Sequence, residues 1–389
     1  MSFLSFLKKF KAALIGLTIL MMIIISAMFT SMEVFARQQD ETHAETIQTE
    51  ELAKEAEVDA GKIIIDHLVD SHEWHLWTYK GHHVSIPLPV FLIHDGEFYA
   101  FMSDKLAHGH HHKGFYIAHE GENKGKIVRE PAYASHGDDE SAGAEPQIPT
   151  DISITKNVLA ILISSILLIV IFVSIAKTYK RREGKAPKGL QSFMEPVIVF
   201  VRDDIAKSSI GESKYERYMP FLLTIFFFIF LNNLMGLVPF FPGGANVTGN
   251  IAVTGVMAVF TFLITTFSAN RAYWQHIINA PGVPWWLKFP IPLMPVVEIV
   301  GMFTKPFVLM VRLFANITAG HTIILGFISL IFIFGNINDF LGVGIGLGFS
   351  IPFAIFMSLL ELLVAFIQAY VFTLLSALYF GMAIEEHHS

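Results

Sequence analysis

The 389-residue chain contains no cysteine, which excludes a disulfide framework, a zinc–thiolate site, an iron–sulfur cluster and a thiolate nucleophile. It is also poor in charge, because only 16% of its residues are Asp, Glu, Lys or Arg, against about 25% in an ordinary soluble domain. It has no Gly-rich phosphate loop of the Gly-x-x-x-x-Gly-Lys-Ser/Thr kind. What it has is 53% hydrophobic residues, including 36 Phe. This composition excludes a disordered tail and a nucleic-acid binder, and it predicts a membrane protein.

The few charges are unevenly distributed along the chain. Residues 37–156 carry 22 Asp and Glu, 10 Lys and Arg, and 13 of the 17 His, whereas residues 218–389 carry only 5 acidic and 4 basic residues. The pattern predicts an acidic, His-rich aqueous domain followed by a domain that lies in lipid. Each charge within the apolar part is therefore a candidate functional residue.

The N-terminus has the pattern of an export signal. Three lysines precede an uncharged run over residues 12–30, and the small residues Val34 and Ala36 stand where a signal peptidase would cleave. The run is 19 residues long, whereas such a region usually has about 7–15, so an uncleaved anchor is the alternative. Residues 1–36 are thus expected to be a signal peptide or an anchor. Both lead to an extracytoplasmic domain over residues 37–151.

Within this exported domain, residues 40–60 are expected to form a linker or a short helix, and residues 132–150 a flexible tether. Residues 82–102 are rich in Val, Ile, Phe and Tyr around Asp95-Gly96, which predicts a β-hairpin. A cluster of histidines follows, which either binds a transition metal or forms a solvated polar loop. Its members are His108, His110, His111 and His112.

Five apolar segments predict an all-α membrane domain over residues 152–389. The predicted spans lie at about 157–177, 220–240, 250–269, 292–334 and 344–384. Six basic residues between 177 and 188 follow the first span and are expected to stay in the cytoplasm. Alternation of the spans then places the C-terminus in the cytoplasm too. The amphipathic residues 190–217 predict a helix that lies on the cytoplasmic surface.

The last two apolar segments are about twice as long as a membrane is thick, since each would measure roughly 60 Å as a helix. Strong tilt, or kinks near Pro292, Pro295 and Pro306, would absorb the excess length. A tilted antiparallel hairpin with its turn over residues 335–342 is the expected arrangement.

The charges in this hairpin lie at matched levels. In an antiparallel pair, facing residues have position numbers with a constant sum; Arg312 with Gln368 gives 680 and His321 with Glu361 gives 682. Both sums place the turn near residue 340, where the Gly- and Asn-containing segment lies. Two groups of side chains are therefore predicted, and not one compact cluster, because His321 points about 180° away from Arg312 on an ideal helix.

The chemistry of these residues suggests a proton path. An intramembrane Arg stays protonated because its pKa exceeds about 12, so it acts as a fixed cation, whereas His and Glu can relay protons. Glu298, Lys305 and Arg312 fall on one helical stripe. The alternative is a set of structural salt bridges or snorkelling side chains, which suits Lys305 best.

Several ordered motifs resemble subunit a of F-type ATP synthases. They are Asn233-Leu-Met-Gly-Leu-Val-Pro239, Asn246-Val-Thr248, Lys305-Pro306, Arg312-Leu-Phe-Ala-Asn-Ile-Thr-Ala-Gly-His321 and Gln368-Ala-Tyr-Val-Phe372. The resemblance covers residues 152–389. It implies a proton-translocating stator in the bacterial inner membrane, with two half-channels beside a rotating ring of c subunits. The b subunits of the peripheral stalk and the rest of the F1F0 complex are the other implied partners, besides the bilayer; no nucleic acid, cofactor or active site of its own is implied.

The resemblance also implies roles for particular side chains. Arg312 matches the essential arginine that separates the half-channels, and Asn316 and Gln368 match its polar neighbours. His321 and Glu361 match an acid–histidine pair in the outer channel, in the reverse of the order found in some bacterial members. Glu298 matches an acid of the cytoplasmic channel. Gly236 stands where many bacterial relatives have an acid.

Two other functions were weighed against this one. A stand-alone cation/proton antiporter usually shows inverted repeats with broken helices in both halves, and no duplicated half is visible in the sequence. A structural anchor that carries an extracytoplasmic binding domain would not explain charges at matched levels in the hairpin. The sequence does not decide whether the coupling ion is a proton or sodium, although the His321/Glu361 pair favours protons.

Overall fold

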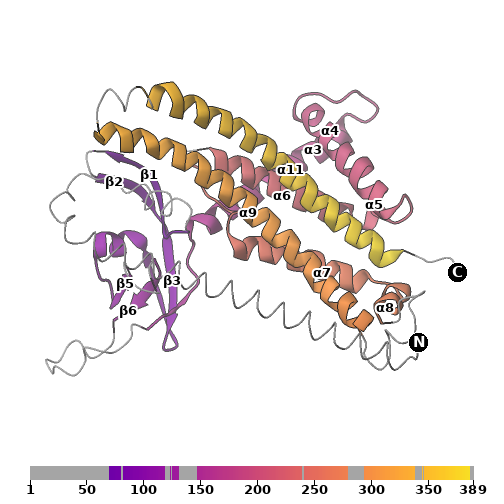
Figure 1. Cartoon of the computed structure of the whole chain (residues 1–389), viewed down its shortest axis with the longest axis horizontal. Coiled ribbons are helices and arrows are strands. Elements are labelled where there is room, and N and C mark those ends of the chain that lie inside the picture. The colour runs from indigo at the N-terminus through magenta and orange to yellow at the C-terminus, as the bar shows by residue number, and fades with distance from the viewer. Residues whose placement is uncertain are drawn as a thin grey trace, which may run out of the picture.

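The computed structural model describes residues 70–79, 82–118, 123, 125–130, 147–238, 241–278, 293–337, 344 and 346–385. Its long helices lie side by side, and the β-strands gather at one end of them (Figure 1). At this end α9 (Leu293–Ile337) finishes and α11 (Ile351–Ile384) begins, while the C-terminus lies at the opposite end (Figure 1). The predicted signal peptide or anchor and the predicted linker over residues 40–60 fall outside the described residues.

Five helices in the described part of the chain are long and apolar enough to cross a membrane. They are α3 (Lys156–Arg181), α6 (Met219–Leu237), α7 (Ile251–Ser268), Pro295–Ser329 within α9, and Gly348–Ile384, which consists of the end of η6 (Gly346–Ser350) and all of α11. A short helix, α8 (Arg271–Ile278), lies between α7 and α9. The predicted all-α, multi-pass fold class is therefore confirmed, and each span lies within a few residues of its predicted position.

The domain that is predicted to be exported, called the exported domain below, contains short antiparallel strands in its described residues. They are β1 (Glu73–Tyr79), β2 (His82–Pro87), β3 (Pro89–His94), β4 (Glu97–Met102), β5 (Phe115–Ile117), β6 (Ile127–Arg129) and β7 (Thr150–Asp151), with the 3-10 helix η1 (Ser103–Gly109) after β4. They pair as β1-β2, β4-β3-β7 and β5-β6. The predicted hairpin joins β3 to β4 through Asp95 and Gly96, which both have positive φ (52° and 79°), as this tight turn requires. Its inward face packs Val90 and Leu92 against Phe115.

The prediction of a flexible tether over residues 132–150 is wrong at its C-terminal end. Gln147 exchanges two backbone hydrogen bonds with Arg129, and Thr150–Asp151 forms a third strand beside β3. The composition was misleading because the pairing partners are distant in the sequence. Residues 132–146 of the predicted tether lie outside the described residues.

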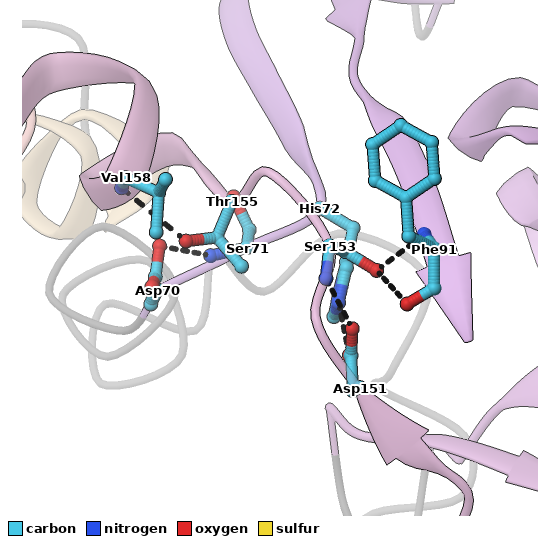
Figure 2. A network of polar contacts seen from close by, with 8 residues as sticks. All are labelled: Asp70, Ser71, His72, Phe91, Asp151, Ser153, Thr155 and Val158. Carbon is cyan, nitrogen blue, oxygen red and sulfur yellow. Dashed lines mark hydrogen bonds and ion pairs between the residues drawn. The ribbon is translucent and has the colours of Figure 1, made fainter. Parts of the chain in front are cut away.

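A polar network joins the exported domain to the first residues of α3 (Figure 2). Asp70 Oδ1 accepts hydrogen bonds from the backbone N–H groups of Ser71 and Asn157, both at 3.0 Å. The bond from Asn157 satisfies a donor at the start of α3 that the helix itself leaves free, and the negative charge of Asp70 suits the positive end of the helix dipole. His72 Nε2 lies 2.7 Å from Asp151 Oδ2. The domain is thus held firmly to the membrane helix that follows it.

The segment between α3 and α6 differs from the single surface helix predicted over residues 190–217. It is divided into α4 (Leu190–Phe200), a π-helical stretch η3 (Val201–Lys207), the single turn α5 (Ser208–Ile210) and the 3-10 turn η4 (Tyr215–Arg217). Val201 and Ile205 of η3 are fully buried in the core formed with α6 and α11. Phe193 of α4 is 74% exposed, whereas the next residue along the helix, Met194, is buried.

Small residues let the helices of the membrane domain approach closely, as is usual where lipid removes the hydrophobic drive for helix association. Ala369 and Ala377 of α11 are fully buried beside α6 and α7. A Cβ atom at Gly381 would collide with the backbone carbonyl of Ser209, so only glycine permits this crossing of α11 and α5. The hydrophobic core therefore lies between α6, α11 and η3.

The long hairpin is confirmed, with one correction. At 1.5 Å per residue, the 45 residues of α9 span about 68 Å and the 34 of α11 about 51 Å, so both exceed the thickness of a membrane. The helix α9 continues through Pro306 and past the expected start of the turn at Gly335, as far as Ile337. The remainder of the predicted turn, residues 338–342, lies outside the described residues.

Candidate functional site in the α9–α11 hairpin

Arg312 and Gln368 lie at the same level of the hairpin, as the constant sum predicts. Both line a small pocket between α9 and α11, together with Leu309, Leu313, Val371, Phe372 and Leu375. Gln368 is buried, with 6% of its surface exposed, whereas Arg312 is exposed on the outer face of the hairpin. Of the residues that the structure describes, none with a carboxylate forms an ion pair with Arg312. The permanently charged side chain of Arg312 is therefore exposed at the side of the hairpin, near the middle of two apolar helices.

The apolar surroundings of Arg312 are exposed as well. On α9, Phe307 and Val308 are 59% and 39% exposed; on α11, Leu363 and Ile367 are 54% and 39% exposed. Asn316, one helical turn beyond Arg312, is also exposed. This face of the hairpin is thus an open, largely apolar surface with a polar centre.

His321 and Glu361 form a second polar site, nearer the end of the hairpin where the exported domain lies. His321 Nδ1 is 3.9 Å from Glu361 Oε1, which confirms the predicted pairing. The distance is too long for a direct hydrogen bond. Glu361 is only 5% exposed, yet neither of its carboxylate oxygens accepts a hydrogen bond from any described residue. A buried carboxylate in this state requires water or a proton.

Two glycines make room for this pair. A Cβ atom at Gly320 would collide with the Glu361 carboxylate, and one at Gly236 would approach His321 Nε2 to 3.3 Å. Gly236 stands near the end of α6, and the same Cβ would lie 3.4 Å from the carbonyl oxygen of Ala245. The site is therefore formed by α9, α11, the end of α6 and the loop between α6 and α7.

Polar side chains continue from this site into the loop between α6 and α7. The hydroxyl of Thr248 donates a 2.5 Å hydrogen bond to Asn233 Oδ1, and the amide of Asn233 donates to the backbone carbonyl of Ala365 at 3.3 Å. Thr318 of α9 donates to the carbonyl of Gly249 at 3.5 Å. Sequence reasoning quoted Asn233 and Thr248 as parts of motifs and assigned no site to them. The signal that could have found them is a run of amides and hydroxyls beside an apolar span.

Glu298 and Lys305 lie on α9 toward the opposite end of the hairpin from His321. Glu298 is half-buried on α9 and close to α8, where burial and the Glu298 carboxylate raise the pKa of the Tyr273 hydroxyl. Lys305 Nζ lies 5.6 Å from the centre of the Tyr379 ring of α11, within the range of a cation–π contact. This contact supports a structural role for Lys305. The candidate charges are thus separated along the hairpin into the His321–Glu361 pair, the central cation Arg312 and the acid Glu298.

Two members of the histidine cluster, His111 and His112, contact other side chains of the exported domain. Among the described residues, no group of three or more His, Cys, Asp or Glu side chains could hold a metal ion. His111 Nδ1 lies 2.7 Å from Glu130 Oε1, and its ring stacks on Tyr116 with centroids 4.8 Å apart. The ring of His112 instead packs edge-on against Phe101. Burial lowers the pKa of the His112 imidazole, with a contribution from Lys105 and Lys113.

Comparison with known proteins gives a consistent result. A family model described as "ATP synthase A chain" matches residues 158–381, which is more than half of the chain. A second model, described as "Domain of unknown function (DUF8433)", matches residues 63–152.

Curated relatives carry the same name. ATP synthase subunit a of Chloroherpeton thalassium is 46% identical over 245 residues, which cover 61% of this chain and 69% of the relative. ATP synthase subunit a 2 of Chlorobaculum tepidum is 48% identical, with 61% and 65% covered. ATP synthase subunit a 2 of Prosthecochloris aestuarii is 43% identical over 284 residues, with 71% and 81% covered.

Proposed function

The chain belongs to the ATP synthase A chain family, and on this premise we propose that it translocates protons beside the c-ring and couples their flow to ATP synthesis. It is a multi-pass protein of the bacterial inner membrane and a component of the F0 sector. The three relatives above are named as ATP synthase subunits and none as an antiporter, so that alternative has no support. The chemistry on ATP belongs to other chains of the complex, and this chain acts without an active site or cofactor of its own.

The observation that carries this proposal is the exposed, unpaired guanidinium of Arg312. A charge within a membrane segment is costly unless it has a partner, and Arg cannot lose its proton to avoid that cost. No described carboxylate pairs with it, although the surrounding surface of α9 and α11 is open. A carboxylate carried past this surface by a c subunit supplies the missing partner. Arg312 holds that carboxylate ionised and so prevents a proton from crossing directly between the half-channels.

Two separate routes lead to this central cation. His321 and Glu361 serve the outer half-channel, because they lie toward the exported domain and Glu361 requires water or a proton. A water between the two side chains would bridge their 3.9 Å separation. Glu298 serves the cytoplasmic half-channel from the opposite end of α9. Asn316 and Gln368 flank Arg312 and orient it.

The charge pattern and the fold together support the proposed orientation. The strands and the end of α9 lie at one end of the helices, and the C-terminus lies at the other (Figure 1). The basic residues after α3 favour the cytoplasm, so the exported domain, the hairpin turn and the His321–Glu361 pair face outward. We assign residues 37–151 to the exported domain and residues 1–36 to a signal peptide or an anchor.

The central experiment is Arg312→Ala, measured as ATP-driven proton pumping in inverted membrane vesicles. Pumping should be abolished while the complex still assembles, because only the fixed cation is lost. Arg271→Ala is the matched control, since Arg271 is an exposed arginine of α8 that lines neither polar site, and it should pump normally. Pumping that survives in the Arg312 variant would overturn the assigned role.

A second experiment tests the outer relay. Glu361→Gln removes the titratable group and keeps the shape of the side chain, so proton uptake should slow without a passive leak appearing. Uptake at the wild-type rate would remove Glu361 from the path. Glu298→Gln tests the inner route in the same way.

A further inference from the structure

The exported domain touches the membrane domain through one deeply buried aromatic side chain. Trp74 of β1 is only 3% exposed and packs in a cluster with Ala160 of α3 and with Ala245 and Val247 of the loop between α6 and α7. Its ring also meets Phe241 of the same loop edge-on, with centroids 5.2 Å apart. A buried Trp of this kind contributes a large apolar contact area. The loop is thus held by the exported domain on one side.

The other side of this loop borders the outer polar site. The carbonyl oxygen of Ala245 and His321 Nε2 both lie within 3.4 Å of the same point, the position that a Cβ atom would take at Gly236. Thr248 and Gly249 of the loop are hydrogen-bonded to Asn233 of α6 and Thr318 of α9. Ala245 therefore belongs to a loop that packs against Trp74 and also borders the surroundings of His321, so a displacement of the loop changes the environment of the imidazole.

The strand that carries Trp74 is itself fixed to the membrane domain. The residues just before β1 are bonded to the start of α3, through Asp70 to Asn157 N–H and through the Ser71 carbonyl to Lys156 N–H at 2.9 Å. His72 is bonded to Asp151 just before α3, as Figure 2 shows. β1 and β2 are paired along their length, with one irregularity between His75 and Trp77. Trp74 thus packs against the α6–α7 loop from a strand that is hydrogen-bonded to the membrane domain.

We propose that Trp74 is a positioning residue for the proton path, and that the β1–β2 hairpin of the exported domain forms part of the outer entrance. The inference rests on the proposed function, because it assumes that protons from outside pass His321. It assigns to the domain of unknown function a role in shaping the α6–α7 loop. Trp74 touches no proton-carrying group itself and acts through Ala245 and Val247.

The test separates proton entry from later steps. Inverted membrane vesicles that contain the whole ATP synthase have the exported domain in their lumen, so ATP synthesis is measured against lumen pH after an acid–base jump. In Trp74→Ala the lumen proton concentration needed for the half-maximal rate should change about fivefold or more, while the maximal rate stays close to wild type. Trp74→Phe should restore the wild-type half-maximal value, because a ring still reaches Phe241 and Val247.

Phe98→Ala is the matched control, since Phe98 is an aromatic residue of the same domain that is 62% exposed and lies in β4, away from the loop. Its lumen-pH profile should equal that of the wild type. If Trp74→Ala prevents assembly, Trp74→Leu keeps apolar volume without the edge contact and is measured in the same way. Wild-type profiles in the assembled Trp74 variants would overturn the inference, and so would an equal change in Phe98→Ala.

Failure of this inference is distinguishable from failure of the proposed function. Arg312→Ala in the same vesicles should block synthesis at every lumen pH. A block at Arg312 together with an unchanged Trp74 profile would reject only the role of the exported domain. Synthesis that survives in Arg312→Ala would reject the proposed function, whatever the Trp74 variants do.

Discussion

Replacing Gly320 with alanine places a methyl group against the carboxylate of Glu361. A Cβ atom at position 320 would collide with Oε1 and lie 3.0 Å from Cδ and 3.2 Å from Cγ, whereas comfortable contacts between carbon atoms are about 3.5–4.0 Å. Either the carboxylate swings away from His321, or α9 and α11 move apart at this level. Both outcomes disturb a pair that already stands 3.9 Å apart.

The expected effect on stability is small and the expected effect on proton transfer is large. Overpacking of this kind costs about 1–3 kcal/mol, and alanine recovers about 1 kcal/mol over glycine through its better helix propensity. The complex should therefore still assemble. A misplacement of about 1 Å at a reacting group, by contrast, can cost about 100-fold in rate. We expect ATP-driven proton pumping by Gly320→Ala to fall about 10- to 100-fold per assembled enzyme.

The assay is pumping in inverted vesicles, normalised to the amount of assembled complex. Gly326→Ala is the matched control on the same helix, because no described atom beyond the adjacent residues and the nearby helix backbone lies within 4 Å of its added Cβ, and it should pump normally. Glu361→Asp shortens the carboxylate by one methylene, so Gly320→Ala should have little further effect in that background. Equal pumping by the two alanine variants, or an undiminished loss in the Asp background, would refute the steric reasoning.

Two further predictions concern stability. Gly381→Ala sets a methyl group against the carbonyl of Ser209, which is backbone and cannot rotate away, so the thermal stability of the detergent-solubilised complex should fall by about 1–3 kcal/mol. Burial alone would raise the pKa of Asp151, but hydrogen bonds from His72 and the backbone and side chain of a neighbouring serine lower it below the ordinary value. The stabilisation that comes from this lowered pKa is therefore present above the ordinary Asp pKa of about 3.9, and it is lost as pH falls through the lower folded value. Asp151→Asn should speed hydrogen exchange at the start of α3 at pH 7. The difference from wild type should vanish in strong acid.

The hydropathy of the sequence was sufficient to predict the spans and the hairpin, because long apolar runs have few alternatives in a membrane. The pairing of His321 with Glu361 and the shared level of Arg312 and Gln368 followed from the antiparallel geometry alone, without any knowledge of packing. Such pairings are predictable because a helix rises by a constant amount per residue. Residues at equal distances along the chain from the turn therefore lie at the same level on the two arms of the hairpin.

The loop between α6 and α7 could not be predicted in the same way. Its prolines, glycines and asparagines look like an ordinary external connection, yet Thr248 bonds to Asn233, and a Cβ atom at Gly236 would lie close to both Ala245 and His321. The contact between Trp74 and Ala245 of this loop joins residues that are about 170 positions apart in the sequence, so no local pattern encodes it. The β7 pairing was missed for the same reason, since Thr150 lies far along the chain from Ile93.

The geometry of the outer pair bears on whether it is a structural salt bridge. A charge-assisted hydrogen bond that stabilises a fold is typically about 2.7–2.9 Å long, whereas His321 Nδ1 stands 3.9 Å from Glu361 Oε1. Gly320 leaves space for the carboxylate of Glu361, and neither oxygen of this carboxylate accepts a hydrogen bond from a described residue. Both features cost stability, since a buried carboxylate without a hydrogen bond is expensive. A fold selected only for stability would close this gap or fill it with an apolar side chain, so the open arrangement favours a site through which protons pass.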